Sequence, residues 1–441
     1  MASTYLTRTE GTATSRRKFT VSTWIKKGAV SGNEQHFYNS FLSSSYRFMV
    51  YFTGSEELQV RNMDNNSANL NYITNRIFRD TSAFYHIVIE VDTTQATASD
   101  RVKIYVNGEQ ETSFSTSVDP SQNTDLSLGS SSYTTNIGRY GGGSNNVDGI
   151  MTHYHFIDGT AYDADTFGET DSTTGIWKPK TAPSVTYGTN GFFLKFENSG
   201  SMGTDSSGNS NNFTVNGTLT QTEDTPSNVF ATMNPLVPTA SLAFSNGNTT
   251  LTGSNDTLYS SNNNSTLGVS AGKYYAEVEY DTAGGNTSPT VGVTPITTSA
   301  TTNTTGSVTD AVVIRMDNDL YVEGVTTSAY LGSTPSAGDI IGIALDLDNG
   351  KIWFSLNGTF VGDPVAGTGA AFDGITSGET MCFCTRALGA VFKWNFGNGY
   401  FGTVKVASAN SDTAGIGEFE YSVPSGYYSL CTKNINLLEY S

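Results

Sequence analysis

The segment GDIIGIALDLDNGKIWFSLNG, residues 338–358, places the strongest constraint on the fold of this chain. Apolar residues occupy every second position on either side of Asn349-Gly350, namely Ile341, Ile343, Leu345, Leu347, Ile352, Phe354 and Leu356. A period of two is typical of a strand with one buried face, whereas a helix needs apolar residues three and four apart. Asn-Gly at 349–350 and again at 357–358 favours tight turns, because both residue types tolerate positive φ. The segment therefore predicts an antiparallel hairpin followed by a second turn.

The same period recurs in the first half of the chain. Three runs show it: Phe19, Val21, Thr23 and Ile25; Tyr85, Ile87, Ile89 and Val91; and Val102, Ile104 and Val106 before an Asn107-Gly108 turn. Between such runs lie stretches rich in Ser, Thr, Asn and Gly, such as 206–212 and 260–268, and no run has a sustained helical period. We therefore predict an all-β protein built from antiparallel β-sandwiches.

Composition limits the classes of function. The 441 residues include 24 Phe, 23 Tyr and 4 Trp, enough to build cores, and the net charge is -18. A charge of this sign repels nucleic acid and anionic membrane surfaces. The sequence has no run of eighteen apolar residues, and no apolar core of a signal peptide follows Met1. We therefore expect a chain made in a cytoplasm that binds no nucleic acid and does not insert into a membrane.

The three cysteines, Cys382, Cys384 and Cys431, are too few to form a disulfide framework for a chain of this length. Cys382 and Cys384 are two apart, which on a strand places both on one face. A zinc site would need a wider gap and further ligands. We expect buried free thiols.

Several longer segments of the chain resemble domains of two known families. FTVSTWIKK, FYHIVIEVDTTQATASDRVKIYVNGEQ and NIGRYGGGSNNVDGIMTHYHFIDGTAYD resemble, in order and spacing, a laminin-G-like domain of the concanavalin A-like superfamily. GKYYAEVEYD, the 338–358 hairpin, VFKWNFGNG and YSVPSGYYSL resemble a SPRY domain, which is another two-sheet sandwich. The resemblance implies an all-β chain with two antiparallel β-sandwich domains of jelly-roll type. These are a laminin-G-like sandwich at 1–165 and a SPRY-like sandwich at 240–441, joined by a connecting segment at 166–239 that packs on the first.

The start MASTYLTRT and the join, which contains FGETDSTTGIWKPK and DTPSNVFATMNPL, are similar to a group of structural proteins of bacteriophages, especially marine ones. That resemblance implies a virion location and a tail-fibre or adsorption-appendage role in host attachment. A capsid-surface decoration or head-fibre protein is the main alternative, and a polysaccharide depolymerase is a remote one. The implied partners are other virion proteins and a host-surface glycan or receptor, with a homo-oligomer expected and a trimer favoured.

Two rows of acidic residues are candidate catalytic groups. Retaining glycoside hydrolysis needs two carboxyl groups about 5 Å apart. Glu90 and Asp92 are two residues apart on a predicted strand, so their carboxyl groups share one face. Glu277, Glu279 and Asp281 in YAEVEYD also share a strand face. Alternating apolar partners explain both segments as strands with one wet face, and no nucleophile elbow, zinc-protease motif or phosphate loop is present. We therefore expect a non-enzymatic protein.

Metal sites have weak support. His153 and His155 share a strand face, but few other histidines exist to complete a site. Calcium is the one cofactor that the pattern admits, because carboxylates and loop carbonyls suit a hard cation. The candidate ligands are Asp100, Asp148, Asp158 and Asp205.

Glycan sites in sandwich proteins pair an aromatic platform with polar loop groups. Tyr133, Tyr140 and Asn145 lie in or near GRYGGGSNN, and Tyr330 lies in TTSAYLGS. Tyrosines at loop tips serve equally well as protein contacts, so glycan binding and protein binding both fit this pattern.

One basic cluster is also present near the first strand. It consists of Arg16, Arg17, Lys18, Lys26 and Lys27. A solvated strand edge explains these residues, and a docking surface for an acidic neighbour is the alternative.

Overall fold

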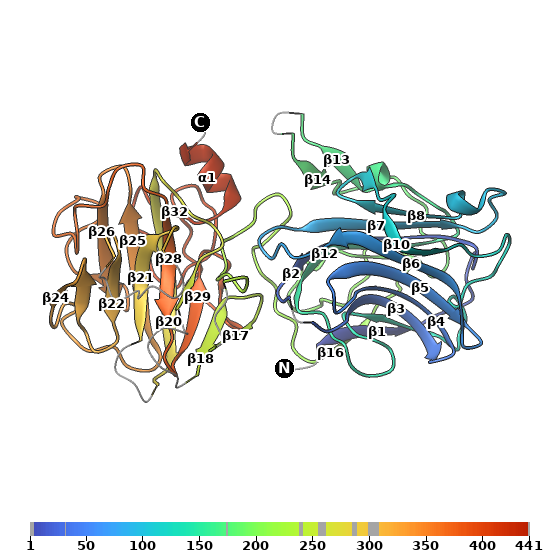
Figure 1. Cartoon of the computed structure of the whole chain (residues 1–441), viewed down its shortest axis with the longest axis horizontal. Coiled ribbons are helices and arrows are strands. Elements are labelled where there is room, and N and C mark those ends of the chain that lie inside the picture. Colours follow the sequence, from blue (N-terminus) through green and yellow to red (C-terminus); the bar gives the residue numbers. More distant parts are fainter. Residues whose placement is uncertain are drawn as a thin grey trace. The chain divides into compact units, whose positions relative to one another are not determined.

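The computed structural model describes residues 4–30, 32–172, 175–237, 241–254, 262–284, 289–298 and 308–439 (Figure 1). The chain divides into two compact units, Met1–Gln221 and Thr222–Ser441. Each unit contains two large, mostly antiparallel sheets, which confirms the predicted all-β sandwiches. The connecting segment expected at 166–239 is divided, because residues up to 221 belong to the first unit and the rest belong to the second.

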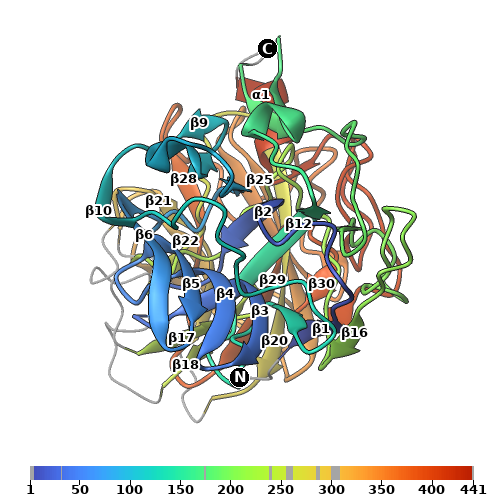
Figure 2. The ribbon, with the colours of Figure 1, turned by 90° about the vertical axis from the view of Figure 1, so that its right-hand side faces the viewer.

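The first unit pairs an eight-stranded sheet with a six-stranded sheet. In spatial order, the eight-stranded sheet contains β10 (Phe114–Val118), β6 (Ser67–Ile77), β5 (Glu57–Asp64), β4 (Tyr46–Phe52), β3 (Gln35–Ser43), β11 (Thr134–Ile137), β1 (Tyr5–Thr9) and β16 (Thr214–Asn216). The six-stranded sheet contains β15 (Phe192–Leu194), β12 (Gly149–Asp158), β2 (Lys18–Lys27), β7 (Tyr85–Asp92), β8 (Val102–Val106) and β9 (Glu109–Gln110). Figure 2 shows β3, β4, β5 and β6 side by side.

The core of the first unit lies between these two sheets. Phe48 and Val50 of β4 enter it from one sheet, and Ile87 and Ile89 of β7 enter it from the other. The predicted inner faces of residues 19–25, 85–91 and 102–106 are confirmed, since their apolar members all belong to or pack against this cluster. Asn107 and Gly108 have φ values of 52° and 86°, as the predicted turn between β8 and β9 requires.

The outer face of the six-stranded sheet is covered by the chain itself. After β12 the chain forms a short 3-10 helix, η2 (Ala164–Thr166), and a hairpin of β13 (Gly168–Thr170) and β14 (Trp177–Pro179), seen in Figure 1 above β7. Phe167 and Trp177 from this segment pack with Val88 and Ile157 of the sheet. Trp177 Nε1 also donates to His86 Nδ1 at 3.0 Å. This cover gives the first unit a third layer on one side.

The second unit is a sandwich of the same kind. One sheet contains β17 (Leu242–Ser245), β18 (Thr250–Gly253), β29 (Val391–Asn395), β20 (Lys273–Thr282), β25 (Asp339–Asp346), β26 (Lys351–Leu356) and β27 (Thr359–Phe360), with β32 (Tyr428–Ser429) parallel to β20. The other contains β19 (Asn262–Asn264), β28 (Met381–Arg386), β21 (Thr290–Pro295), β22 (Val312–Arg315), β23 (Leu320–Val322) and β24 (Val325–Thr327). The remaining elements are η1 (Ala98–Asp100) in the first unit, and β30 (Tyr400–Phe401), β31 (Val404–Lys405) and α1 (Thr432–Glu439) in the second.

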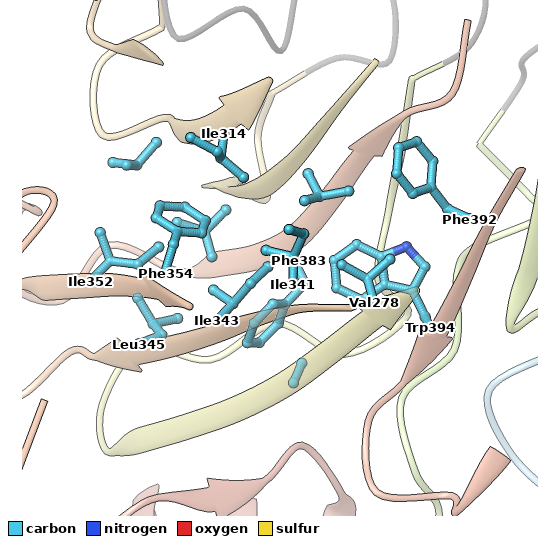
Figure 3. Packing of buried hydrophobic residues seen from close by; sticks show 14 of the residues in the cluster. Val278, Ile314, Ile341, Ile343, Leu345, Ile352, Phe354, Phe383, Phe392 and Trp394 are labelled. Carbon is cyan, nitrogen blue, oxygen red and sulfur yellow. The ribbon is translucent and has the colours of Figure 1, made fainter. Parts of the chain in front are cut away.

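The hairpin predicted at 338–358 is formed by β25 and β26, and its apolar face enters the core of the second unit (Figure 3). Ile341, Ile343 and Leu345 pack there with Ile352 and Phe354. The second turn is also confirmed, since Asn357 and Gly358 have φ values of 48° and 79°.

The cysteine prediction is confirmed: Cys382, Cys384 and Cys431 are free and buried. The solvated strand edge expected for Lys26 and Lys27 is wrong, because both residues are buried in the structure. The period of two that begins at Phe19 continues to Lys27, which points inward at the end of β2. Lys27 Nζ there forms an ion pair with the buried carboxylate of Glu56.

Candidate functional site

The outer face of the eight-stranded sheet carries polar and aromatic side chains. In β4, Phe48 and Val50 point to the core, so Arg47, Met49 and Tyr51 point to the opposite face. Strand pairing extends these rows across neighbouring strands. Met49 lies opposite Arg61 of β5, and Tyr51 lies opposite Gln59. On the other side, Asn39 of β3 lies opposite Met49, Phe41 opposite Arg47, and His36 opposite Tyr51.

A loop at residues 138–148, between β11 and β12, folds over this face. Its backbone is fixed to β3, since Gly141 N donates to Asn39 Oδ1 at 2.8 Å and His36 N donates to Asn145 O at 3.3 Å. Asn145 Nδ2 donates to Glu34 Oε2 at 3.0 Å. These bonds hold the loop in one position on the sheet.

Tyr140 is the aromatic residue that this loop brings to the sheet. Its ring lies 5.1 Å from the ring of His36 and 5.5 Å, edge on, from that of Phe41. The Arg47 guanidinium lies 5.8 Å from the Tyr140 centroid. The His36 ring stacks on Tyr51 at 4.3 Å. We call His36, Arg47, Tyr51, Arg61 and Tyr140 the outer-face patch.

Three polar atoms of the outer-face patch are buried without a hydrogen-bond partner among the described residues: His36 Nδ1, Arg47 Nη1 and Arg61 Nε. Buried polar groups in folded proteins nearly always have a partner, so such atoms indicate bound water or a ligand. His36 Nε2 faces Glu34 Oε2 at 3.0 Å. If Nε2 carries the proton, as a carboxylate partner favours, Nδ1 is left as an acceptor. The patch then offers donors, an acceptor and aromatic rings together.

Burial controls the charge states in the outer-face patch. It lowers the pKa of His36, and the hydrogen bond that His36 donates to Glu34 only partly opposes this. His36 is therefore mostly neutral at pH 7. Burial also raises the pKa of Tyr51 to about 12, so this phenol keeps its proton and donates to Gln59 Oε1 at 2.6 Å. The positive charges of the patch are thus those of Arg47 and Arg61.

The four predicted glycan residues have different positions. Tyr140 and Asn145 belong to the loop on the eight-stranded sheet, where Tyr140 is partly exposed. Tyr133 and Tyr330 are not the loop-tip platforms that the sequence suggested. Tyr133 is only 6% exposed, and Tyr330 packs edge on against Phe354 at the core of the second unit.

The calcium candidates do not converge on one site. Asp158 is buried, and its carboxylate accepts backbone N–H groups from Thr14, Ser15 and Asn190 at 2.8 to 3.1 Å. Asp205 accepts N–H groups in the same way, among them Phe193 N at 2.8 Å. Asp100 is exposed on η1, and Asp148 lies in the 138–148 loop. Among the residues that the structure describes, no three His, Cys, Asp or Glu side chains gather to hold a metal ion.

His153 and His155 do not form a ligand pair of a regular strand. The pairing of β12 with β2 is irregular between Thr152 and His155, and His153 has a φ of 45°. His155 stacks on Phe193 at 3.9 Å and contacts the Tyr187 hydroxyl at 3.0 Å. Burial lowers the pKa of both imidazoles. The contacts of these two histidines are packing contacts within the sandwich.

The first acid row is occupied by structural contacts. Glu90 accepts a hydrogen bond from the Tyr105 hydroxyl at 2.8 Å. Asp92 accepts hydrogen bonds from Thr94 and Gln95 and forms an ion pair with Lys18 at 3.1 Å.

The wet face predicted for the second acid row is wrong at Glu277, which is fully buried. Its carboxylate accepts the backbone N–H groups of Glu420 and Tyr421 at 2.9 and 2.8 Å. Burial raises the pKa of Glu277 to about 7. Glu279 and Asp281 both pair with Lys393. These contacts make Glu277 an anchor for residues 420–421.

A concave feature lies elsewhere in the first unit. It is an open depression of about 500 Å³ lined by Asp163, Asp165, Thr166, Lys180, Ala182, Pro183 and Ser184. Lys180 Nζ is already engaged there, since it donates to Asp165 O at 2.6 Å. The outer-face patch, with its unpartnered polar atoms, is the better candidate for a ligand site.

Sequence reasoning found Tyr140 but missed His36, Arg47, Tyr51 and Arg61. The segment YRFMVYF at 46–52 carries the signal that would have found two of them, because its apolar positions alternate with Arg47, Met49 and Tyr51. That these residues meet the 138–148 loop depends on the pairing of β3 with β11, which are about ninety residues apart.

The fold and the outer-face patch define a class of protein, in which β-sandwich modules bind carbohydrate or protein. The sequence comparisons agree. Residues 1–165 match the family model described as the concanavalin A-like lectin/glucanases superfamily, and residues 273–398 match the model of the SPRY domain. The predicted order of a concanavalin A-like domain and a SPRY domain is therefore confirmed. No curated protein sequence matches the chain.

The chain also matches solved structures, each over about a third of its length. The SPRY domain of human HERC1 is 21% identical, with 35% of this chain and 91% of that chain covered and a TM-score of 0.27. The PSpry domain of TRIM65 is 16% identical, with 37% and 91% covered and a TM-score of 0.29. The SAP-like pentraxin from Limulus polyphemus is 16% identical, with 36% and 72% covered and a TM-score of 0.28.

The structure also bears on membrane insertion. Within the described ranges, no helix is both long and apolar enough to cross a membrane.

Proposed function

We propose that this chain is a non-enzymatic structural protein of a bacteriophage virion, part of a tail fibre or another adsorption appendage, whose first sandwich binds a host-surface glycan. The observation that carries the glycan part is the outer-face patch. It combines three buried polar atoms that have no partner among the described residues with the partly exposed ring of Tyr140. Sugars need such a combination, because their hydroxyls require hydrogen bonds and their C–H faces pack on aromatic rings.

The virion part of the proposal is supported by the sequence. The N-terminal segment and the join between the two sandwiches resemble those of phage structural proteins with the same domain order. The absence of enzymatic function is supported by the state of the acid rows, since Glu90, Asp92 and Glu277 are each engaged by neighbouring groups. A carboxyl group held in this way is poorly placed to act on a substrate.

Glycan binding is tested with the full chain on an array of bacterial surface polysaccharides. Tyr140→Ala is expected to lower binding about two- to tenfold, because contacts with an aromatic ring contribute about 0.5–1.5 kcal/mol beyond the area that they bury. Tyr46→Ala is the matched control, since Tyr46 lies on the same strand as Arg47 and is partly buried but outside the patch. Equal binding by wild type and Tyr140→Ala would remove the patch from the proposal.

The virion location is tested separately by electron microscopy of intact particles labelled with an antibody to this chain. Label confined to the tail supports the adsorption role. Label distributed over the capsid shell would instead favour a decoration or head-fibre protein, and unlabelled particles would contradict a virion location.

A further inference from the structure

Arg47 and Arg61 lie close together on the outer face of the eight-stranded sheet. They lie on neighbouring strands, and because Arg47 pairs with Met63 and Arg61 with Met49, they are diagonal neighbours about 7 Å apart at Cβ. Both side chains are partly buried. Arg17 and Arg76, by contrast, form ion pairs with Asp125 and Glu111. Within the described residues, neither Arg47 nor Arg61 has a carboxylate at ion-pair distance.

The sheet around these two arginines is almost free of acids. Strands β3, β4 and β6 contain no Asp or Glu, and β5 has Glu57 and Asp64 only at its ends. The first unit is also the less acidic one. Residues 1–221 contain 16 basic and 21 acidic side chains, a net charge of -5, whereas residues 222–441 contain 7 and 20, a net charge of -13. The two arginines outnumber the one neighbouring acid, Glu34, so the outer-face patch is a local positive surface on an acidic protein.

The partly buried position of the arginines matters for binding strength. A charge that is shielded from bulk water interacts more strongly with a bound counter-charge than an exposed one does. The planar guanidinium also matches the geometry of carboxylate and sulfate oxygens, with two parallel N–H donors. Arg47 Nη1 and Arg61 Nε are donors with no partner among the described residues. They are thus available to the oxygens of an anionic group.

We propose that the ligand of the outer-face patch is an acidic saccharide, whose carboxylate or sulfate group binds Arg47 and Arg61 while its ring lies against Tyr140. This inference rests on the proposed glycan binding and specifies its chemical class. His36 Nδ1 accepts a hydrogen bond from a sugar hydroxyl in this arrangement. Glu34, whose carboxylate is bonded to His36 and Asn145, forms the acidic rim that keeps the charged group on the arginine side.

The test measures binding of three hexasaccharides to the full chain by titration calorimetry: an alginate fragment that carries carboxylates, a carrageenan fragment that carries sulfates, and an unsulfated agarose fragment. The wild-type protein is expected to bind at least one acidic fragment at least tenfold more tightly than the agarose fragment. Alginate binding would identify the anionic group as a carboxylate, and carrageenan binding would identify it as a sulfate. Raising NaCl from 50 to 500 mM is expected to weaken acidic binding severalfold, because salt screens the ion pairs.

Variants of the two arginines test whether the acidic saccharide binds at the outer-face patch. Arg61→Gln and Arg47→Gln are each expected to weaken acidic binding ten- to a hundredfold, since each removes a charge-assisted hydrogen bond. Arg79→Gln makes the same charge change at an exposed residue and is expected to alter it less than twofold. Arg61→Lys keeps the charge, so it should retain part of the affinity and shows that the loss in Arg61→Gln is not a folding defect.

Two outcomes would overturn the inference in distinguishable ways. Equal or better binding of the agarose fragment, or unchanged acidic binding in both arginine variants, would refute the acidic class and leave glycan binding in place. Failure of the wild type to bind any saccharide, on the array or in solution, would remove the proposed glycan function together with this inference.

Discussion

The buried ion pair of Lys27 and Glu56 gives the sharpest test of how the first unit is stabilised. Both side chains are at most 2% exposed, and Lys27 Nζ also lies 4.5 Å from the centre of the Phe52 ring. Glu56 belongs to the turn between β4 and β5, and its carbonyl accepts Phe78 N at 2.7 Å. The pair therefore ties the end of β2 to a turn of the opposite sheet.

The substitution Lys27→Met keeps most of the side-chain volume and removes the charge. It leaves the Glu56 carboxylate buried without its cation, and such a loss costs about 3–5 kcal/mol of unfolding free energy. For a unit of 221 residues, each kcal/mol lowers the melting temperature by about 2–4 °C. We therefore expect the transition of the first unit to fall by about 10 °C.

The assay is differential scanning calorimetry of the full chain, with hydrogen exchange of peptides from β2 and β4 to assign the transition. Lys195→Met is the control, because Lys195 forms an exposed pair with Glu197 at 3.7 Å and its loss should cost less than about 1 kcal/mol. The double variant Lys27→Met with Glu56→Met should recover most of the stability, since no charge is left unpaired. A double variant as unstable as Lys27→Met alone would refute the reasoning.

Three further predictions concern other buried groups. Burial raises the pKa of Glu277 from 4.5 to about 7, so the folded second unit binds this proton more tightly than the unfolded chain does. The free energy of unfolding is therefore highest below pH 4.5, and it falls by about 3 kcal/mol as the pH rises from 4.5 through 7. Urea titrations at pH 4.5 and 7.5 should show this difference in unfolding free energy in the wild type and in Glu279→Gln but not in Glu277→Gln. The same difference in all three proteins would contradict the prediction. Trp177→Ala should uncover the six-stranded sheet and, because Trp177 is only partly buried, cost less than the about 3–5 kcal/mol of a fully buried tryptophan; faster tryptic cleavage after Lys180 is the readout, and an unchanged rate would argue against the covering role. Asp158→Ala leaves three backbone N–H groups without their acceptor and should cost about 2–4 kcal/mol, measured by thermal unfolding, whereas a loss below 1 kcal/mol would show that water replaces the carboxylate.

Local pattern predicted the hairpins well, because the two strands of each hairpin and their turn are close in sequence. The β8–β9 and β25–β26 hairpins follow from their Asn-Gly turns, and the faces that β7, β8, β25 and β26 bury follow from a period of two. The same rule does not predict that a charged residue such as Lys27 or Glu277 is buried. Such a residue is buried only when a distant segment supplies its partner, here the turn at Glu56 or the backbone at 420–421.

The candidate site was predictable only in part for the same reason. Tyr140 and Asn145 stand in a glycine-rich loop, which marks them as surface residues. Arg47 and Arg61 stand in strands whose outer face is ambiguous until it is known which sheet is covered. The six-stranded sheet is covered by residues of the segments 162–172 and 175–187, and the period of two is the same in both sheets, so it does not show which sheet is covered. The third layer therefore decides where the site lies, and its position is a matter of long-range packing.

The strict alternation along β4 has a consequence for how this protein can change. Phe48, Val50 and Phe52 maintain the core, while Arg47, Met49 and Tyr51 face outward and contribute little to it. Substitutions at the second set alter what the surface recognises, whereas the first set keeps the strand in register. A lineage that must follow a shifting ligand can therefore diversify every other residue of this sheet while its scaffold stays the same.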